Sequence, residues 1–475
     1  MGAGELAQLY CGNKQMDTYI FYNPEISYFK FAYHRHTNFG LSTAKLDFDN
    51  KPFLSNKDDK FRCYIVKNDF NILTDIYFKY KIPDIYSNDK YKFQWISNFG
   101  SLIIKRANLI VNETIIDTIT GEWLVISNEL NEITKDNYNK ITGNLSSFLN
   151  PKMDFSVITI NNNRYKNSYP NGNKSLNKPS IKGKELIIPL KFNITKNPSL
   201  GLLLSKITGG VSNIYIEIIL ENIENLYQIY SQELNMYISP IYYNELYPND
   251  NINIDKFVIS KEINAYIEAS FVILDTPELK TLIDKPQIDI LIEKILISSD
   301  YTLTPGIDLV NNILLTNANT HIKEIIWTIK RDDFYKYNEN TNYTNSIPEN
   351  LDNSIMSKAR IMLNKTIERV TEKEANYYNI IQPYQHHTSI PKQGIYCYSF
   401  ALLPENYKPS GSLNASGFEI SLYINTTEAN NTIINNKLNK IGKNSYNYNY
   451  RLNYYIRSMN ILRYINGTVA YVLAE

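Results

Sequence analysis

Short hydrophobic runs recur along the whole chain, and they are rich in Ile, Val, Tyr and Phe. Runs of this length and composition are typical of β-strands. In the segment 418–424 apolar and polar positions alternate regularly, which predicts a strand with one buried face and one solvated face. Further strands are predicted at 61–66, 75–82, 102–111, 214–220, 322–329 and 395–402. The pattern indicates an all-β protein built from sandwiches.

Two segments have helical signals instead. After Gly121, the residues Trp123, Ile126, Leu130 and Ile133 follow at helical spacing. The segment 275–278 combines a capping Asp, an early Pro and a capping-box Glu. Short helices inserted between strands are predicted at both places. The segment 354–370 fits either a helix or a strand, because its apolar residues match both periods.

Three segments rich in Asn, Lys, Ser and Tyr are predicted to be exposed insertions: 161–180, 336–350 and 428–449. Sequons of the form Asn-x-Ser/Thr make Asn173, Asn342 and Asn425 candidate glycosylation sites. In a chain this rich in asparagine, most such sequons are expected to arise by coincidence.

A weak internal repeat is also present. The segment 187–192, followed by 197–200, is echoed by 396–402 and 408–411, at an offset of about 210 residues. A second pair, 103–105 and 322–323, has a similar offset. Two tandem copies of one β-fold are therefore predicted.

Composition narrows the class of protein further. The chain has 475 residues, of which 43% are hydrophobic and 20% charged, so it contains enough apolar material for large cores. Lys and Arg number 49 against 48 Asp and Glu, so no net field favours nucleic acid or an anionic membrane. No apolar stretch approaches the length of a spanning helix, and no secretory signal is visible. We expect a soluble protein or a part of a soluble assembly.

The histidines and cysteines form weak candidate sites. His34 and His36 lie two residues apart, as in a metal-binding pair on a strand, but no carboxylate follows to complete a ligand set. His386 and His387 are adjacent, so on a strand they would face opposite sides. The three cysteines, Cys11, Cys63 and Cys397, contain no CxxC pair, which excludes a disulfide framework or a four-cysteine zinc site.

Catalytic motifs are not found. The sequence contains no phosphate-binding loop, no GxGxxG and no GxSxG. Cys397 is considered as a nucleophile near His386 or His387, but its apolar strand favours a buried thiol. The basic and aromatic segment 30–35 is similar to a single-strand nucleic-acid binder, yet no second such patch accompanies it. The sequence therefore supports no enzyme, no cofactor and no direct contact with nucleic acid.

Longer motifs identify a family. Asn23–Lys30, continuing into Tyr33–Phe39, closely resembles the N-terminal signature of major capsid proteins of nucleocytoplasmic large DNA viruses. Later segments follow in the family's order: 121–124 with 128–130, 188–192, 271–275 and 321–327. The strongest is 382–388, followed by 394–402 and 409–411. The chain resembles this family from about residue 10 to the end.

The resemblance implies a double jelly roll, that is, two tandem antiparallel eight-stranded sandwiches with short inserted helices. It divides the chain into an N-terminal arm (1–24), a first jelly roll (25–225), a linker (226–240) and a second jelly roll (241–475). It also favours a strand at 354–370. Similar proteins form homotrimers, and the resulting pseudo-hexagonal capsomers tile an icosahedral shell around an internal membrane. The implied partners are neighbouring capsomers, minor capsid proteins and, indirectly, that membrane. The implied location is the virion capsid, assembled in a cytoplasmic viral factory.

The resemblance also singles out residues for packing and assembly. These signature residues are Pro24, Phe29, Arg35, His36, Asn38, Phe39, Gly121, Glu122, Trp123, Trp327, Gln382, Pro383, Tyr384, His386, His387, Tyr398, Phe400, Pro409 and Gly411. Trp95, Trp123 and Trp327 are expected in a core or in a trimer interface. Pro383 and Pro391 are expected to fix a turn or strand edge around 385–388.

Two alternatives to a trimeric capsid subunit remain from other classes. One is a jelly-roll glycan-binding protein of the virion surface, suggested by the Tyr-rich loops and the sequons. The other is a cupin-like metal enzyme that uses His34 and His36. Within the capsid reading, Asn193 and the segment 198–200 depart from the family pattern, so a minor or specialised capsid paralogue is a further possibility.

Overall fold

The computed structural model describes residues 2–10, 14–31, 33, 35–55, 57–65, 70–144, 159–160, 163–164, 169–207, 214–316 and 320–473. The chain divides into two units, Met1–Phe39 and Gly40–Glu475, and each is described by itself. The first unit contains two short helices, α1 (Ala3–Tyr10) and α2 (Lys14–Ile20), followed by a segment that ends where β1 begins. The predicted arm (1–24) is therefore shorter than the first unit.

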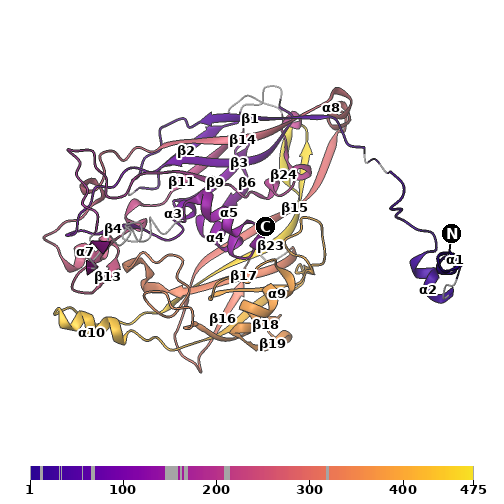
Figure 1. Cartoon of the computed structure of the whole chain (residues 1–475). Coiled ribbons are helices and arrows are strands. Elements are labelled where there is room, and N and C mark those ends of the chain that lie inside the picture. The colour runs from indigo at the N-terminus through magenta and orange to yellow at the C-terminus, as the bar shows by residue number, and fades with distance from the viewer. Residues whose placement is uncertain are drawn as a thin grey trace. The chain divides into compact units, whose positions relative to one another are not determined.

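The second unit begins with a sandwich of two antiparallel sheets (Figure 1). One sheet has the order β1-β14-β3-β10, with β9 also pairing with β3. Its strands are β1 (Phe39–Asp47), β3 (Ile72–Lys81), β9 (Glu185–Pro189), β10 (Leu202–Leu203) and β14 (Asn264–Leu274). The facing sheet has the order β2-β11-β5-β6. Its strands are β2 (Lys60–Tyr64), β5 (Ile104–Val111), β6 (Thr114–Ile119) and β11 (Ile214–Leu220).

A second sandwich follows with the same strand order. One sheet runs β15-β23-β17-β20, with β21 pairing with β17 and β24 with β23. Its strands are β15 (Gln287–Leu303), β17 (His321–Arg331), β20 (Ile395–Ser399), β21 (Leu413–Asn414), β23 (Tyr450–Ile465) and β24 (Thr468–Tyr471). The facing sheet runs β16-β22-β18-β19. Its strands are β16 (Val310–Leu315), β18 (Met356–Leu363), β19 (Ile367–Glu374) and β22 (Ile420–Thr426). The predicted double jelly roll is confirmed.

The identical strand order explains the internal repeat. The strands β9 and β20, which contain its two best-matching segments, both pair with the third strand of their sheet, β3 and β17. The second part of the repeat was wrong, because residue 104 begins β5 whereas residues 322–323 lie in β17, which belongs to the other kind of sheet. Only the first part therefore joins topologically equivalent positions.

The sheet pairing also differs from the predicted division of the chain. The predicted linker, 226–240, contains β12 (Tyr227–Ser231) and β13 (Met236–Ile238), which form a three-stranded sheet with β4 (Phe93–Trp95). The strand β14, which was assigned to the second jelly roll, pairs with β3 along nine positions. The first sandwich therefore extends to Leu274, because a jelly roll needs a strand that returns to lie beside the first one.

The predicted helices are present. Helix α4 (Gly121–Glu129) is capped by the Thr120 hydroxyl, which accepts a hydrogen bond from the Trp123 amide, and α5 (Glu132–Thr142) follows it. Helix α8 (Thr276–Ile283) is capped by Asp275. The ambiguous segment 354–370 forms β18 and the beginning of β19, so the strand reading is confirmed. The remaining helices are α3 (Phe99–Leu102), α7 (Pro240–Leu246), α9 (Gln382–His386) and α10 (Thr432–Lys440).

The prediction of three exposed insertions was partly wrong. Residues 337–344 are largely buried, because their polar side chains hydrogen-bond neighbouring loops. The Asn338 amide, for example, donates to the carbonyls of Glu224 at 2.6 Å and Tyr227 at 2.7 Å. The segment 428–449 contains the amphipathic helix α10, and the Tyr446 hydroxyl lies 2.6 Å from the Tyr337 hydroxyl. Part of 161–180 lies outside the described residues.

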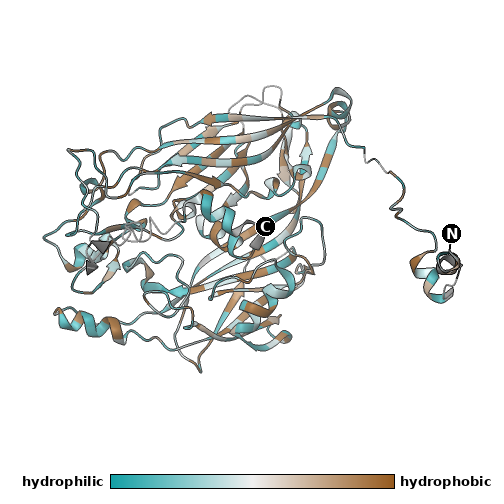
Figure 2. Cartoon of the chain, viewed as in Figure 1, coloured by the Kyte–Doolittle hydropathy of each residue, from teal (hydrophilic) through white to brown (hydrophobic). Residues whose placement is uncertain are grey.

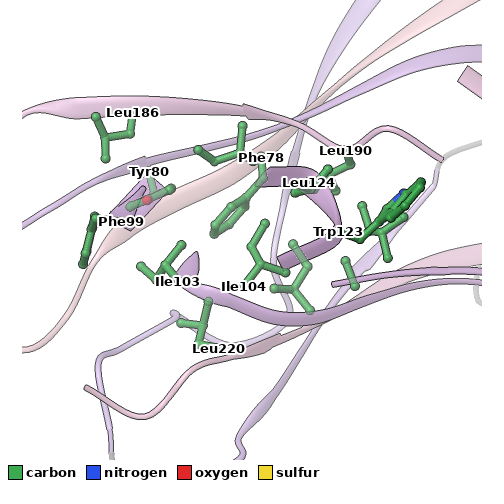
Figure 3. Packing of buried hydrophobic residues seen from close by; sticks show 14 of the residues in the cluster. Phe78, Tyr80, Phe99, Ile103, Ile104, Trp123, Leu124, Leu186, Leu190 and Leu220 are labelled. Carbon is green, nitrogen blue, oxygen red and sulfur yellow. The ribbon is translucent and has the colours of Figure 1, made fainter. Parts of the chain in front are cut away.

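Two hydrophobic cores hold the second unit together. Figure 2 shows hydrophobic and hydrophilic positions alternating along many strands. In the first sandwich, Phe78 and Tyr80 of β3 point toward Ile103, Ile104 and Leu124 (Figure 3). The second sandwich has its own core, which includes Trp327 and the apolar residues of β22. In the predicted strand 418–424, Ile420, Leu422 and Ile424 are buried as expected, but Ser421 is buried as well.

The sheet β15-β23-β17-β20 has two buried faces. In β17, Ile325 and Trp327 belong to the core of the second sandwich, whereas Ile326 belongs to the cluster shared with the first sandwich. Every residue of β17 after His321 is buried as a result. This sheet is thus the layer on which the two sandwiches meet. None of the described helices is long and apolar enough to span a membrane.

Candidate functional site at the junction of the two sandwiches

Helix α4 of the first sandwich lies against the second sandwich, and the signature residue Gly121 begins it. A Cβ atom at Gly121 would lie 2.4 Å from the Ser101 carbonyl oxygen and 2.6 Å from that of Ile104. Only glycine lets the backbone of α4 approach this closely, so Gly121 fixes how the helix sits in the first sandwich.

Glu122 joins α4 to the second sandwich through its carboxylate. Oε1 lies 3.0 Å from the Lys330 Nζ and accepts the Tyr343 hydroxyl at 3.3 Å. Oε2 accepts the Asn453 amide at 2.9 Å. One side chain of the first sandwich therefore binds three donors from two strands and a loop of the second. Charge-assisted hydrogen bonds of this kind are about twice as strong as neutral ones.

Trp123 completes the contact. Trp123 is 3% exposed, and its ring centroid lies 5.2 Å from that of Tyr455. The Arg457 guanidinium lies over the Trp123 ring, 5.5 Å from its centroid. Trp95 and Trp327 are each 0% exposed, so all three tryptophans are buried within the chain. The tryptophans were expected either in a core or in a trimer interface, and each of the three lies in a core.

A buried network of charges lies beside Trp123. Glu324 of β17 forms an ion pair with Arg457 at 2.9 Å and another with His387 at 2.9 Å. The other ring nitrogen of His387 lies 3.0 Å from Glu405. The side chains of Glu324 and His387 are both 0% exposed. An imidazole between two carboxylates donates from both nitrogens, so His387 is a charged, structural histidine here.

The network continues across the junction. Glu293 of β15 pairs with Lys196 of the first sandwich and with Lys323 of β17. The Lys323 Nζ also donates to the Asn406 carbonyl at 2.7 Å. The pairing of β17 with β23 shifts register between Ile322 and Glu324, so Lys323 sits in a bulge. A bulge re-aims side chains, which explains why two consecutive charged residues of this strand are both buried.

Burial and charge move the pKa values of this network in opposite directions. Burial alone would raise the pKa of Glu324, but Arg457 and His387 outweigh it and lower the pKa to about 2. Burial alone would lower the pKa of His387, but Glu324 and the hydrogen bonds around the ring raise the pKa well above 6.5. Burial lowers the pKa of Lys191 to about 8, and Arg457 adds to the effect. The Glu324–His387–Arg457 group is therefore ionised around neutral pH.

Cys397 and His387, which were considered as a nucleophile and its neighbour, are both buried. Cys397 is 0% exposed, and burial raises the pKa of its thiol. Both ring nitrogens of His387 are already engaged with Glu324 and Glu405. The predicted buried thiol is confirmed.

The signature segment 382–388 forms a helix end instead of the predicted turn or strand edge. A π-helical turn (Tyr377–Ile381) leads into α9, with Pro383 in its first turn. Gln382 accepts the Ser399 amide at 3.1 Å, and the His386 ring lies 3.1 Å from the Leu402 carbonyl. Because the pair lies at the end of a helix, His386 and His387 do not point to opposite faces of a strand. Tyr384 is 77% exposed.

The last signature residues lie around strand β20. The rings of Tyr398 and Phe400 meet edge to face at 5.1 Å, and the Arg369 guanidinium lies over both rings. Gly411 has a φ of +134°, a conformation that favours glycine, and a Cβ there would lie 3.1 Å from the Phe400 carbonyl oxygen. Pro409 is exposed.

The N-terminal signature lies in the first unit, where its side chains are exposed. Pro24, Arg35 and Asn38 are exposed, and Phe29 is 98% exposed. The His36 ring lies 2.8 Å from the Thr37 carbonyl and 6.3 Å from the Phe39 ring. His34 lies outside the described residues. Among the described residues, no group of three or more His, Cys, Asp or Glu side chains is placed to hold a metal.

The three sequons differ in accessibility. Asn173 is exposed. Asn425 is partly exposed, and its amide donates to the Ile307 carbonyl at 3.1 Å. Asn342 is 7% exposed, and its amide donates to Glu339 at 2.5 Å and to the Ser346 carbonyl at 2.8 Å. The Asn342 side chain is therefore buried and bonded in the folded chain, contrary to the prediction of a glycosylation site there.

Sequence reasoning missed the charge network as a unit. The signal that could have found it is the pair Lys323 and Glu324 inside an otherwise apolar strand. Buried charges need partners, so such a pair indicates ionic neighbours from elsewhere in the fold. Asn193, which departs from the family pattern, also has a partner, because its backbone amide donates to the buried Asp117 at 2.6 Å.

We expect Gly121→Ala to destabilise the chain by about 1–3 kcal/mol, because the new methyl group would overlap two backbone carbonyls. Gly417→Ala is the matched control, since a Cβ at Gly417 meets nothing within 4 Å. Urea unfolding followed by fluorescence measures both variants. Equal midpoints for the two would contradict the close approach of α4.

Two family profiles of viral capsid proteins match this chain. A family profile described as "Large eukaryotic DNA virus major capsid protein" matches residues 279–470, and one described as "Major capsid protein N-terminus" matches 27–250. The probable capsid protein 4 of Acanthamoeba polyphaga mimivirus is 25% identical, over 90% of this chain and 94% of that relative.

Solved structures agree on the fold. The PBCV-1 virus capsid structure matches with a TM-score of 0.67 at 19% identity, covering 94% of this chain and 100% of that chain. The Faustovirus major capsid protein matches with a TM-score of 0.62 at 10% identity, covering 97% and 98%. Together with the matching profiles and the two jelly rolls of identical strand order, these likenesses show that the chain belongs to the major capsid protein family of large DNA viruses.

Proposed function

We propose that the chain is a structural capsid subunit that forms homotrimers, and that the resulting pseudo-hexagonal capsomers tile an icosahedral virus shell. The observation that carries this proposal is the duplication itself. Each chain contains two sandwiches with the same strand order. Three copies around one axis therefore supply six similar units, and closed symmetry is the usual state of homo-oligomers.

An exposed aromatic segment at 28–33 supports a role in assembly. Tyr28, Phe29, Phe31 and Tyr33 are each 89% exposed or more within one chain. Monomeric proteins rarely expose so many neighbouring apolar side chains, and such segments mark interaction sites. We assign this segment to contacts with neighbouring capsomers or minor capsid proteins.

We also propose where the chain resides in the virion and that it has no catalytic role. The chain would reside in the capsid, assemble in a cytoplasmic viral factory and meet the inner membrane only through other proteins. We propose no catalytic activity, no required cofactor and no direct nucleic-acid contact. The full engagement of His387 and the burial of Cys397 support the first of these statements.

The native mass of the purified protein tests the proposal. Size exclusion with light scattering is expected to give three chain masses, and negative-stain images of the peak are expected to show a hexagonal outline. A stable monomer at high concentration would contradict autonomous trimer formation. It would favour the alternative of a glycan-binding surface protein, which an array of immobilised sugars can examine.

A capsid paralogue is a second candidate, because relatives from one virus carry the names "Probable capsid protein 4" and "Capsid protein 1". A specialised paralogue would be present in fewer copies than the main shell protein. Quantitative mass spectrometry of purified virions distinguishes the two cases through the copy number of this chain.

A further inference from the structure

The charged side chains that gather at the junction of the two sandwiches do not balance. The cations of this group are Lys191, Lys196, Lys323, His387 and Arg457. The carboxylates are Asp117, Glu293, Glu324 and Glu405. When all of them are ionised, five cations face four carboxylates and one positive charge is in excess. Such a charge is costly away from water unless an anion accompanies it.

The carboxylates of this group are bound to partners other than Lys191. Glu293 and Glu324 each pair with two other cations. Glu405 accepts hydrogen bonds from an imidazole and a hydroxyl, and Asp117 accepts them from two backbone amides. Among the described residues, Lys191 is therefore the cation of the group that has no carboxylate partner.

Lys191 lies in the first sandwich, directly after Leu190, which shares a core cluster with Trp123 (Figure 3). Its Nζ lies 4.8 Å from the centroid of the Tyr138 ring of α5, and the described residues give it no hydrogen bond and no ion pair. An aromatic face attracts a cation but does not neutralise it. Burial lowers the pKa of Lys191 to about 8, and Arg457 is the neighbouring charge that lowers this pKa most. The two cations therefore lie close enough to repel each other.

Arg457 of β23 has a buried donor without an acceptor. Its Nη1 lies 2.9 Å from Glu324 and donates to the Pro404 carbonyl at 3.4 Å. Its guanidinium also lies over the Trp123 ring. Its Nε, however, is buried and has no hydrogen-bond partner among the described residues. Buried N–H groups are rarely left unpaired in folded proteins, so an acceptor from outside the chain is expected at this nitrogen.

We propose that the Nε of Arg457 and the Nζ of Lys191 bind one small monovalent anion of the halide class, such as chloride. Its single negative charge would cancel the excess positive charge of the group and supply the acceptor that Nε lacks. A water molecule would accept from Nε but would leave the charge uncompensated. Because Lys191 belongs to the first sandwich and Arg457 to the second, the ion would bridge the two sandwiches within one chain. The site does not depend on the proposed homotrimer.

Thermal unfolding of the full chain in chloride tests the site. Chloride replaces gluconate at constant ionic strength and neutral pH, which separates ion binding from screening. The midpoint of the unaltered chain is expected to rise by roughly 1–3 °C for each tenfold increase in chloride above the dissociation constant, because the ion binds only the folded state. Lys191→Met removes the charge and keeps an unbranched side chain, so its midpoint is expected not to respond. Lys358→Met is the matched control, since the Lys358 side chain is 51% exposed, and it should respond as the unaltered chain does.

Bromide in crystals of the unaltered chain gives a direct measurement that needs no variant. Bromide scatters anomalously, and a peak is expected between the Arg457 Nε and the Lys191 Nζ. A crystal grown in bromide that has no ion at this position would overturn the proposal. Equal chloride responses of the unaltered chain and Lys191→Met would overturn it as well, because the response would then be a general effect of salt. So would the loss of the response in Lys358→Met.

Discussion

Glu324→Ala is expected to destabilise the folded chain by about 3–5 kcal/mol, the usual cost of removing one partner from a buried ion pair. The reason is that Glu324 is buried against two cationic side chains. Its carboxylate lies 2.9 Å from both Arg457 and His387, and none of its side chain is exposed. Removal leaves two buried cations without their carboxylate partner, beside the further cation Lys323.

Urea unfolding at pH 6 measures this effect, with Glu324→Gln and Lys358→Ala as comparisons. Glu324→Gln keeps the shape and removes the charge, so it is expected to lie between the unaltered chain and Glu324→Ala. Lys358 pairs with Glu372 at 3.0 Å, but both side chains are about half exposed, at 51% and 49%. Water screens such a pair, so Lys358→Ala is expected to leave the midpoint nearly unchanged. Equal midpoints for Lys358→Ala and Glu324→Ala would contradict a buried network.

The pH dependence of stability has a definite sign. The pKa of Glu324 is lowered from 4.5 to about 2, so its contribution is present above pH 4.5 and is lost as the pH falls toward 2. The pKa of His387 is raised well above 6.5, so its contribution is present below pH 6.5 and declines as the pH rises further. The network is therefore expected to stabilise most between pH 4.5 and 6.5. In Glu324→Ala the loss on acidification should be smaller.

Trp123→Ala is the second large effect, and we expect a destabilisation of about 3–5 kcal/mol, as is typical of buried tryptophan. Trp123 fills the space between α4 and β23, where it contacts the Tyr455 ring at 5.2 Å and Arg457 at 5.5 Å. Alanine would leave a cavity between α4 and β23, beside Arg457 of the charge network.

Trp123→Phe is the matched control for this variant. Phenylalanine keeps an aromatic ring beside Tyr455 and therefore loses less packing, so its midpoint is expected near that of the unaltered chain. Differential scanning calorimetry measures both variants and also reports whether the two sandwiches unfold together. A single sharp transition of unchanged midpoint in Trp123→Ala would show that α4 does not couple them.

The local sequence predicted most of the individual elements. An apolar run located β11, alternation located β22, and Asp275 with Pro277 located the start of α8. These signals act within a few residues, because a side chain's face and a helix cap depend on neighbouring backbone. The family resemblance then gave the double jelly roll, which periodicity alone did not.

The contacts between the two sandwiches could not be predicted from local sequence. Glu122 binds Asn453, which is 331 residues away, and Glu324 binds His387, which is 63 residues away. A local sequence pattern does not predict such pairs, because the partners lie far apart in the chain. The segment 336–350 was misread for the same reason, since asparagine side chains that look solvated in sequence instead hydrogen-bond the backbone of distant loops.

The sequence by itself determined most of the strands and the helix starts, because each follows from local conformational preference. The tertiary structure alone decided which faces are buried twice. One face of β17 packs into the core of its own sandwich, and the other face is buried only because the first sandwich packs on it. Which charges pair there is settled by that packing, because a carboxylate is stable without water only where the fold places cations around it.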